Sequence, residues 1–177
     1  MNIVQAETEA DWAKASEMLT RVVDHLNRLG QPLWTKEQVS VAGLQRSYQL
    51  DELYFLRESE CVGVVFLQDA DVFFWPEIIE RDCLYIHKLA IDPPFVSLGL
   101  GPLAIDVIIQ EACKKHLNWV RLDCDDRPAL HRFYQSCGFN LVDAKEIGIF
   151  RVARYQLLTK TGERFQRTSK SCFLEND

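Results

Sequence analysis

The feature that most constrains the fold is a strand–helix–strand pattern in the middle of the chain. An apolar run over 84–91, LYIHKLAI, leads into a loop that ends in Gly99-Leu100-Gly101. An apolar segment with helical spacing follows over 102–116, and a second apolar run over 119–124. A helix between two such runs favours parallel pairing, because it carries the chain back so that both strands point the same way. The pattern therefore predicts an α/β fold with parallel strands near its centre.

The segments around this unit supply the other elements. Apolar spacing predicts a helix from Trp12 to Leu29, with Thr8 and Asp11 as a capping pair, and a weaker helix over 36–48. Pro128 and Gly138 delimit a last helix. Apolar runs bounded by turn residues predict strands over 2–6, 53–58, 61–68 and 83–91, and at least one more within 140–158.

This order predicts one domain over 1–159 and a polar C-terminal tail over 160–177. We expect a mixed central β-sheet, antiparallel first and parallel around the strand–helix–strand unit, flanked by helices. The six cysteines form no C-x-x-C pair, so we expect reduced thiols packed as small apolar groups.

Charge and hydropathy exclude several function classes. With 20 basic and 26 acidic residues, the formal charge of −6 disfavours nucleic acid as a partner. The first residues lack the basic and apolar segments of a secretory leader, and no apolar run reaches the roughly 18–20 residues of a membrane span. We therefore expect a cytoplasmic protein that does not act at a membrane.

Gly99 and Gly101 lie between a strand end and a helix start. Free backbone N–H groups and the helix dipole can hold a phosphate there, and glycine lets the phosphate approach closely. A simple tight turn is the alternative explanation. Ala104 replaces the third glycine of the dinucleotide pattern, and the nucleoside-triphosphate pattern ending in Gly-Lys-Ser/Thr is absent. A nucleotide-binding α/β domain stays open as an alternative.

The segments LAIDP and LGLG, followed further along by LHRFYQSCGF, resemble the GNAT acetyltransferase superfamily, and the order of elements agrees along the whole chain. In that family the loop amides bind the pyrophosphate of acetyl-CoA, and the preceding strand binds the pantetheine arm. The resemblance assigns pantetheine contacts to Leu89 and Ile91. It assigns the pyrophosphate loop to Val96, Ser97, Leu98, Gly99, Leu100 and Gly101. The chain departs from the family at Val96 and Leu98, which replace polar or basic residues.

The second family signature matches Phe133, Tyr134 and the Gly-Phe pair at 138–139. The resemblance places Phe133 and Tyr134 at the cofactor and makes Tyr134 the candidate acid for the departing thiolate. A phenol with a pKa of about 10 can protonate or hydrogen-bond to a thiolate whose acid has a pKa of about 8.5. A tyrosine packed on the core face of its helix is the alternative. Arg127 replaces the family's asparagine, and it either meets a phosphate or is a solvated surface arginine.

Acetyl transfer to an amine also needs a base, because an ammonium must lose a proton before it attacks. His87 lies on the strand with the same parity as Leu89 and Ile91, and an ordinary histidine pKa of about 6.5 suits the role. A hydrogen-bonded strand histidine is the alternative. Trp34 lies between the first two helices, a region that often lines the acceptor pocket in the family, although it can also be a core aromatic residue.

Asp123, Asp125 and Asp126 raise the question of a metal. The glycine and the closing glutamate of a calcium loop are missing, so we expect these residues to cap the strand end and the next helix, and we expect no metal.

The resemblance implies an N-acetyltransferase that moves the acetyl group of acetyl-CoA, its cosubstrate, to a primary amine by direct attack in a ternary complex. The expected partner is a small-molecule or peptide amine, and a homodimer is a possible assembly. The alternative is a non-catalytic GNAT-fold binding or regulatory module with weakened CoA affinity, since the glycine loop carries no side-chain charge. The acceptor itself has no signature in the sequence.

Overall fold

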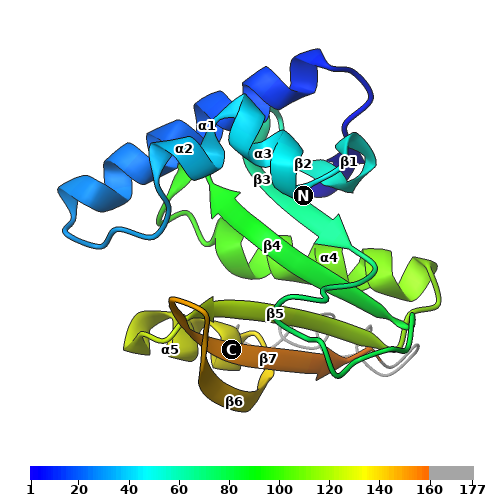
Figure 1. The fold of residues 1–177 in the computed structure, drawn as a ribbon. Coiled ribbons are helices and arrows are strands. Elements are labelled where there is room, and N and C mark those ends of the chain that lie inside the picture. Colours follow the sequence, from blue (N-terminus) through cyan, green and yellow to red (C-terminus); the bar gives the residue numbers. More distant parts are fainter. Residues whose placement is uncertain (160–177) are drawn as a thin grey trace, which may run out of the picture.

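A mixed sheet forms the centre of residues 1–159, the part of the chain that the computed structural model describes (Figure 1). Within these residues the sheet has seven strands in the order β1-β2-β3-β4-β5-β7-β6. The strands are β1 (Asn2–Gln5), β2 (Leu53–Arg57), β3 (Cys61–Gln68), β4 (Cys83–Ile91), β5 (Trp119–Asp125), β6 (Asn140–Ile147) and β7 (Phe150–Leu158). The pair β4–β5 is parallel and the other neighbouring pairs are antiparallel. The predicted mixed sheet is confirmed.

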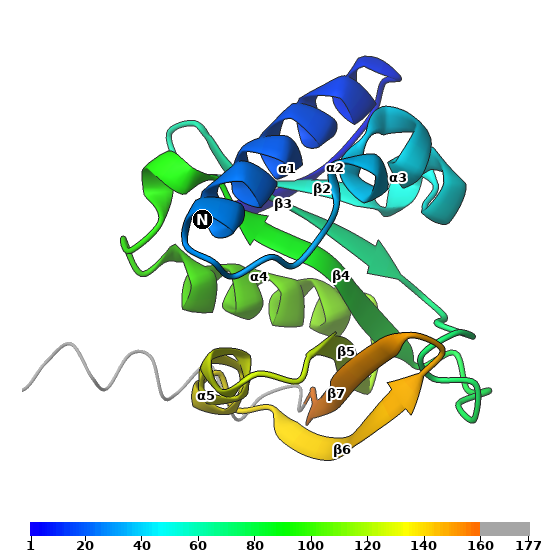
Figure 2. The ribbon, with the colours of Figure 1, turned by 60° about the vertical axis from the view of Figure 1, so that its left-hand side comes forward.

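Helices cover both faces of the sheet (Figure 2). They are α1 (Ala10–Arg28), α2 (Lys36–Val39), α3 (Val41–Ser47), α4 (Leu100–Lys114) and α5 (Pro128–Ser136), with two 3-10 turns, η1 (Leu50–Glu52) and η2 (Pro93–Phe95). Helices α1 to α3 bury Leu19 and Leu44 against Phe66 of β3 on one face. On the other face, Ile105 and Ile108 of α4 pack against Leu84 of β4, because their side chains recur at helical spacing. Among the described helices, none combines the length and the apolar composition that crossing a membrane requires.

One predicted helix differs from the structure, whereas the strand prediction for 140–158 is confirmed. The predicted helix over 36–48 is divided at Ser40, whose extended backbone ends α2 while its side chain accepts a hydrogen bond from Gly43 N–H and caps α3. A Cβ on Gly43 would lie 2.1 Å from the carbonyl oxygen of Glu37, so only glycine fits between the two short helices. Residues 140–158 form two strands, which Gly148 joins at a φ of +60°.

The cysteines agree with the prediction as far as they are described. Cys61, Cys83, Cys113, Cys124 and Cys137 are free thiols, of which Cys83 and Cys124 are buried. Cys172 and the predicted polar tail over 160–177 lie outside the described residues.

A β-bulge interrupts β4 at Lys88. Val64 of β3 pairs with Ala90, and Phe66 pairs with His87, so two steps along β3 face three steps along β4. Lys88 has a φ of +46°, which is uncommon for a residue with a side chain. Because the extra residue reverses the alternation of faces, His87 points to the side of α1–α3, whereas Leu89 packs on the side of α4. The prediction that His87 shares a face with Leu89 and Ile91 is therefore wrong.

The parallel pair separates towards its carboxyl end. Pairing between β4 and β5 extends only from Cys83 with Trp119 to Ile86 with Leu122, although both strands continue beyond that point. In Figure 1 the two strands meet at one end and diverge at the other. The last residues of β4 therefore keep their β3 partners while the backbone groups on the other edge of β4 are released from β5.

Candidate active site

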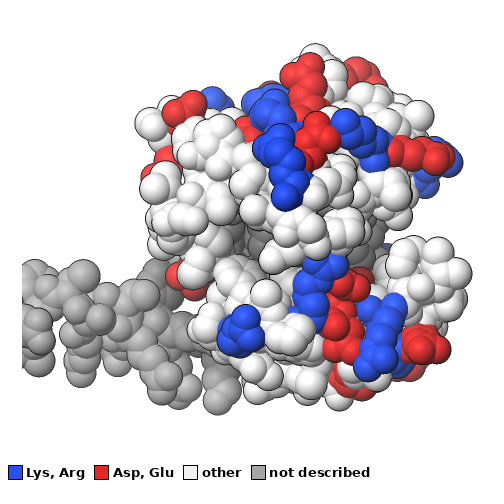
Figure 3. All heavy atoms as spheres, turned by 90° about the vertical axis from the view of Figure 1, so that its left-hand side faces the viewer, with Lys and Arg blue, Asp and Glu red and all other residues white. Residues whose placement is uncertain are grey.

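A cavity with a volume of about 440 Å³ opens where β4 and β5 diverge. Its walls include β4 from Ile86 to Leu89 and β5 from Asp123 to Asp125. The aromatic residues of the lining are Trp34, Tyr48, Phe73, Phe74, Tyr134 and Phe150. Seen from the side of the diverging strands, the surface is hollowed between its upper and lower parts (Figure 3). A cavity of this size with a few polar groups among aromatic walls has the usual form of a small-molecule site.

His87 lies between two carboxylates. Its Nε2 is 3.6 Å from Asp71 Oδ2, and its Nδ1 is 4.0 Å from Asp123 Oδ1. Within residues 1–159, His87 Nε2, Asp71 Oδ2 and Asp123 Oδ1 are buried and have no hydrogen-bond partner. Both distances exceed a direct hydrogen bond, but catalytic hydrogen bonds are often long before substrate binds. One ligand atom from each of the three residues lies within 4.8 Å of the others, so the cluster has the spacing of a metal site as well as that of a proton-transfer group.

Asp71 is held rigidly in a turn between β3 and β4. Its Oδ1 accepts hydrogen bonds from the N–H groups of Phe73 and Phe74, at 3.1 and 2.9 Å. Arg154 of β7 fastens this turn to the sheet: its Nη1 donates to the carbonyl oxygen of Phe74 at 2.8 Å and pairs with Glu77 at 2.7 Å. The position of Asp71 next to His87 is thus set by contacts from a distant strand.

Burial dominates the proton affinities of this cluster. It lowers the pKa of His87, although the charge of Asp71 opposes the shift, so the imidazole is neutral near pH 7 and able to accept a proton. Burial and the neighbouring charge of Asp71 raise the pKa of Asp123 to about 7. The cluster therefore exchanges protons in the neutral range, as a general base must.

Tyr134 reaches the same cavity from the opposite face of the sheet. It is buried on α5, with its ring 5.0 Å from Phe133 and 5.7 Å from Tyr155. Burial raises the pKa of its phenol well above the ordinary value, so the hydroxyl keeps its proton near pH 7. A protonated phenol at the cavity is the state that a proton donor needs.

The glycine loop adjoins α5 outside the cavity lining. Gly99 has a φ of +72° and precedes α4, whose first turn receives no side-chain cap from the described residues. A Cβ on Gly101 would lie 3.1 Å from Cε2 of Phe133, so this glycine allows α4 and α5 to approach closely. Val96 and Leu98 are 44% and 65% exposed. The phosphate contact predicted for these uncapped amides stays a prediction, and no polar side chain at those two positions assists them.

Arg127 and Trp34 both line the cavity. The Arg127 guanidinium pairs with Asp125 and donates from Nη2 to the carbonyl oxygen of Pro32 at 2.9 Å, which ties the loop before α2 to the start of α5. Trp34 of that loop lines the cavity, in agreement with its predicted position. The phosphate contact predicted for Arg127 stays a prediction, because its donors bond to the protein here.

The helix-capping role predicted for Asp123, Asp125 and Asp126 is wrong. Arg127 is the N-cap residue of α5, and no side chain of the described residues caps that helix. Asp126 instead pairs with His131 and Arg151, both at 2.7 Å. Sequence reasoning also missed Asp71 and Lys88. The adjacent His87 and Lys88 in an otherwise apolar strand are the signal that could have drawn attention to β4.

Solved structures share this fold. The alignment with a GNAT-family acetyltransferase from Listeria monocytogenes 4b F2365 covers 88% of this chain and 93% of that one, with a TM-score of 0.70 and 16% identity. The aminoglycoside acetyltransferase AAC(6')-Ib in complex with coenzyme A and kanamycin gives a TM-score of 0.68 at 16% identity, over 95% of this chain and 98% of that one. The Escherichia coli ribosomal-protein-S18-alanine N-acetyltransferase gives 0.60 at 17% identity, over 92% and 97%. The chain thus has the fold of the GNAT acetyltransferases.

The sequence comparison defines the family. The acetyltransferase (GNAT) family model matches residues 15–139, so the chain belongs to this family. A curated relative, the uncharacterized N-acetyltransferase YesJ of Bacillus subtilis (strain 168), is 29% identical over 99 residues, which are 53% of this chain and 55% of the relative. The chain spans about half the length of the curated relative it matches.

Proposed function

We propose that the protein transfers the acetyl group of acetyl-CoA to a primary amine in a ternary complex. The observation that carries the proposal is the placement of His87 and Tyr134, which reach one cavity from opposite faces of the sheet at the point where β4 and β5 diverge. A neutral base and a protonated acid in one cavity suit a reaction in which the nucleophile loses a proton and the leaving group gains one.

Acetyl-CoA fits the residues beside the cavity. The uncapped amides at the start of α4 suit its pyrophosphate, since a helix N-terminus attracts anions. Beyond Ile86, β4 has no pairing with β5 within residues 1–159, so the backbone of Leu89 and Ile91 is free to bond to the amides of the pantetheine arm. Binding both reactants next to each other would supply much of the rate acceleration.

The proton path uses the two sides of the cavity. The acceptor ammonium gives a proton to His87, and the neutral nitrogen then forms a bond to the carbonyl carbon of the thioester while the carbon–sulfur bond breaks. Tyr134 donates its proton to the departing thiolate, and the nitrogen, which still carries one proton more than the amide product, returns that proton to the phenolate. Asp71 orients His87, and Asp123 stabilises the imidazolium that forms. Two proteins of the same fold, the aminoglycoside acetyltransferase and the ribosomal-protein-S18-alanine N-acetyltransferase, support acetyl transfer to an amine.

A turnover screen tests the proposal. Free thiol released from acetyl-CoA should appear with at least one class of primary amine, and calorimetry should detect CoA binding. Tyr134→Phe should lower kcat about tenfold or more while CoA still binds, because general acid catalysis of this kind contributes about 10²–10⁴. Tyr54→Phe, which alters a buried tyrosine of β2 outside the cavity, is the matched control and should leave kcat unchanged. Absence of CoA binding at millimolar ligand would overturn the proposal.

A second candidate has one observation in its favour. The loop before α4 presents the exposed apolar side chains of Val96 and Leu98 where a charge would assist the pyrophosphate. A GNAT-fold binding module with weak CoA affinity would have this property. Thiol release with any amine would exclude it, whereas CoA binding without turnover across the amine screen would favour it.

A further inference from the structure

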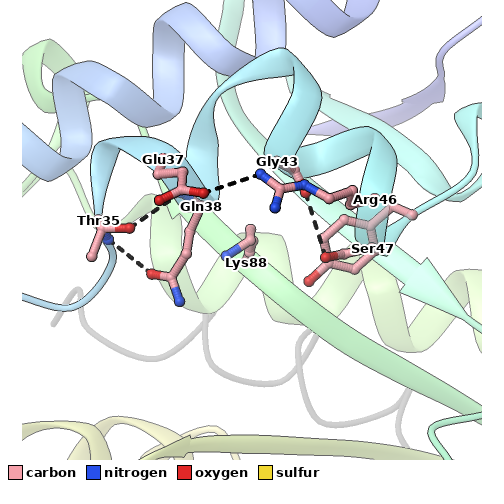
Figure 4. Close-up of a pocket in the computed structure, with 8 residues that line it drawn as sticks. Thr35, Glu37, Gln38, Gly43, Arg46, Ser47 and Lys88 are labelled. Carbon is pink, nitrogen blue, oxygen red and sulfur yellow. Dashed lines mark hydrogen bonds and ion pairs between the residues drawn. The ribbon is translucent and has the colours of Figure 1, made fainter.

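A second cavity of about 450 Å³ adjoins the first. It lies between α2, α3 and the bulge of β4, and Figure 4 shows Lys88 rising towards the two short helices. Gln38, Tyr48 and Lys88 line both cavities, so these three residues form the boundary between them. A ligand whose amine lies near His87 can therefore extend past Lys88 into the second cavity, which we call the α2–α3 cavity.

Lys88 is a half-buried cation without an anionic partner. Among residues 1–159, no carboxylate oxygen lies within 4.0 Å of its Nζ, whereas Lys36 and Lys114 pair with Asp24 and Glu111. Its Nζ lies 4.9 Å from the ring centre of Trp34, which also lines the first cavity. Burial lowers the pKa of Lys88 to about 8, and the nearby charge of Asp123 opposes the shift. The ammonium thus remains mostly charged at pH 7 in a place where charge is costly.

The α2–α3 cavity offers further donors. Arg46 of α3 pairs with Glu37 at 3.3 Å through Nη2, and this exposed pair is weak. Gln38 accepts a hydrogen bond from Thr35 N–H through Oε1, which leaves its amide NH₂ free to donate. Lys88, Arg46 and the Gln38 amide line this space together with one carboxylate, Glu37, which pairs with Arg46 (Figure 4). Among the described residues, two cations and an amide donor therefore face a single anion, which leaves Lys88 available to a bound anion.

We propose that Lys88 forms an anion subsite for the acceptor, so that the preferred substrates are amines that also carry a carboxylate or phosphate group. This inference rests on the proposed function, which places the amine beside His87 and Asp123. The two ends of the acceptor would then meet opposite charges: the ammonium meets the carboxylates of Asp71 and Asp123, and the anion meets Lys88. A diamine of the same length would instead bring its second ammonium against Lys88 and Arg46.

Three matched series of acceptors test the subsite. Unbranched ω-aminocarboxylates of increasing length are compared with the n-alkylamines and the α,ω-diamines of the same carbon number, and aminoalkyl phosphates separate phosphate from carboxylate. At the best length, kcat/KM for the anionic acceptor should exceed that for the alkylamine by about tenfold or more, as expected for a charge-assisted hydrogen bond in a site shielded from water. The diamine should be the poorest acceptor of the three.

Variants assign the preference to Lys88. Lys88→Gln should reduce the ratio of the two kcat/KM values to about one, and Lys88→Arg should retain most of it. Lys114→Gln, which removes an exposed lysine at the end of α4, is the matched control and should leave the ratio unchanged. Equal kcat/KM for the charged and uncharged acceptors, or an equal ratio in Lys88→Gln, would overturn the subsite and leave acetyl transfer intact.

A binding measurement keeps the two proposals separable. If no amine in any series releases thiol although CoA binds, the proposed function fails. The subsite is then judged by thermal shift: aminocarboxylates at high concentration should stabilise the unaltered protein and not Lys88→Gln. Equal shifts in both proteins would overturn the subsite as well.

Discussion

The region proposed for the cofactor and the region proposed for the acceptor are built on different principles. The cofactor side, which comprises the loop over 96–101, α4 and Phe133 and lies outside the cavity lining, depends on shape: Gly101 lets two helices touch, and the backbone at the start of α4 is left uncapped. The acceptor side, which comprises Asp71, His87, Lys88 and Asp123, depends on charge, because among residues 1–159 Asp71 Oδ2, His87 Nε2 and Asp123 Oδ1 are buried without a hydrogen-bond partner. The bulge at Lys88 in β4 turns His87 and Leu89 to opposite faces of the sheet, so each residue faces a different side.

This difference follows from what each side has to do. A cosubstrate with a fixed structure can be bound by backbone groups, which sequence changes alter little. An acceptor amine must be bound, deprotonated and distinguished from similar amines, which requires charges of the right sign. Unpartnered buried charges destabilise the fold, so their concentration on the acceptor side indicates selection for function at some cost in stability.

The largest expected effect is on the acceptor side. His87→Gln keeps a polar side chain of similar size but removes the base, so kcat/KM for the amine should fall by about 10²–10⁴. The dissociation constant for CoA should stay within about twofold, because His87 lies on the face of β4 opposite Leu89. Steady-state kinetics and calorimetry measure the two quantities.

His25→Gln, on the last turn of α1, is the control for this variant. It should leave both quantities unchanged. A loss of CoA affinity in His87→Gln as large as its loss of kcat/KM would break the division into two sides, since it would show that the histidine serves the cofactor as well.

The next largest expected effect is a pH-dependent change in the free energy of unfolding when Asp123 is replaced. Its pKa rises from about 3.9 in the unfolded chain to about 7 in the fold. Between these values the folded state binds the extra proton, so this group's contribution to stability falls as the pH rises from about 4 to about 7. At pH 8 the buried carboxylate is ionised, and this lowers the free energy of unfolding by up to about 4 kcal/mol for a pKa raised from about 3.9 to about 7. Asp123→Asn should therefore be more stable than the unaltered protein at pH 8, with little gain at pH 4.

Urea denaturation at both pH values measures the difference. Asp106→Asn, which neutralises an exposed carboxylate of α4, should show the same change at pH 4 and pH 8. If Asp123→Asn destabilises the protein at pH 8, the carboxylate has a stabilising partner. The acceptor side then does not hold an unfavourable buried charge, and the contrast with the cofactor side fails.

The two sides also differ in how well the sequence predicts them. The strand–helix–strand unit, the glycine loop and the α5 segment around Tyr134 have local patterns, so their positions follow from spacing and a family resemblance. The acceptor side assembles from a turn at Asp71, a bulge at Lys88 and the end of β5, which meet only in three dimensions. A one-residue bulge has no periodic signal, and it reversed the predicted face of Leu89 relative to His87. The position of Asp71 depends on Arg154, which lies on another strand.

The smallest expected effect tests whether the cofactor side depends on shape alone. Gly101→Val places a side chain against the ring of Phe133, where even a Cβ would lie 3.1 Å from Cε2, and should cost about 1–3 kcal/mol of stability through overpacking. Because Phe133 adjoins Tyr134, the shift should also weaken CoA binding severalfold. Gly99→Ala is the matched control: its Cβ meets no atom within 4 Å, and it should cost about 1 kcal/mol from the positive φ alone.

A double-mutant cycle separates packing from backbone strain. In Phe133→Ala the ring is absent, so adding Gly101→Val should cost much less than it does alone, whereas Gly99→Ala should cost the same with or without the ring. Additive costs for Gly101→Val and Phe133→Ala would show that the glycine does not serve the contact between α4 and α5. The cofactor side would then depend on the backbone of the loop instead of on helix packing, and the weakened CoA binding would have to arise at the amides of α4.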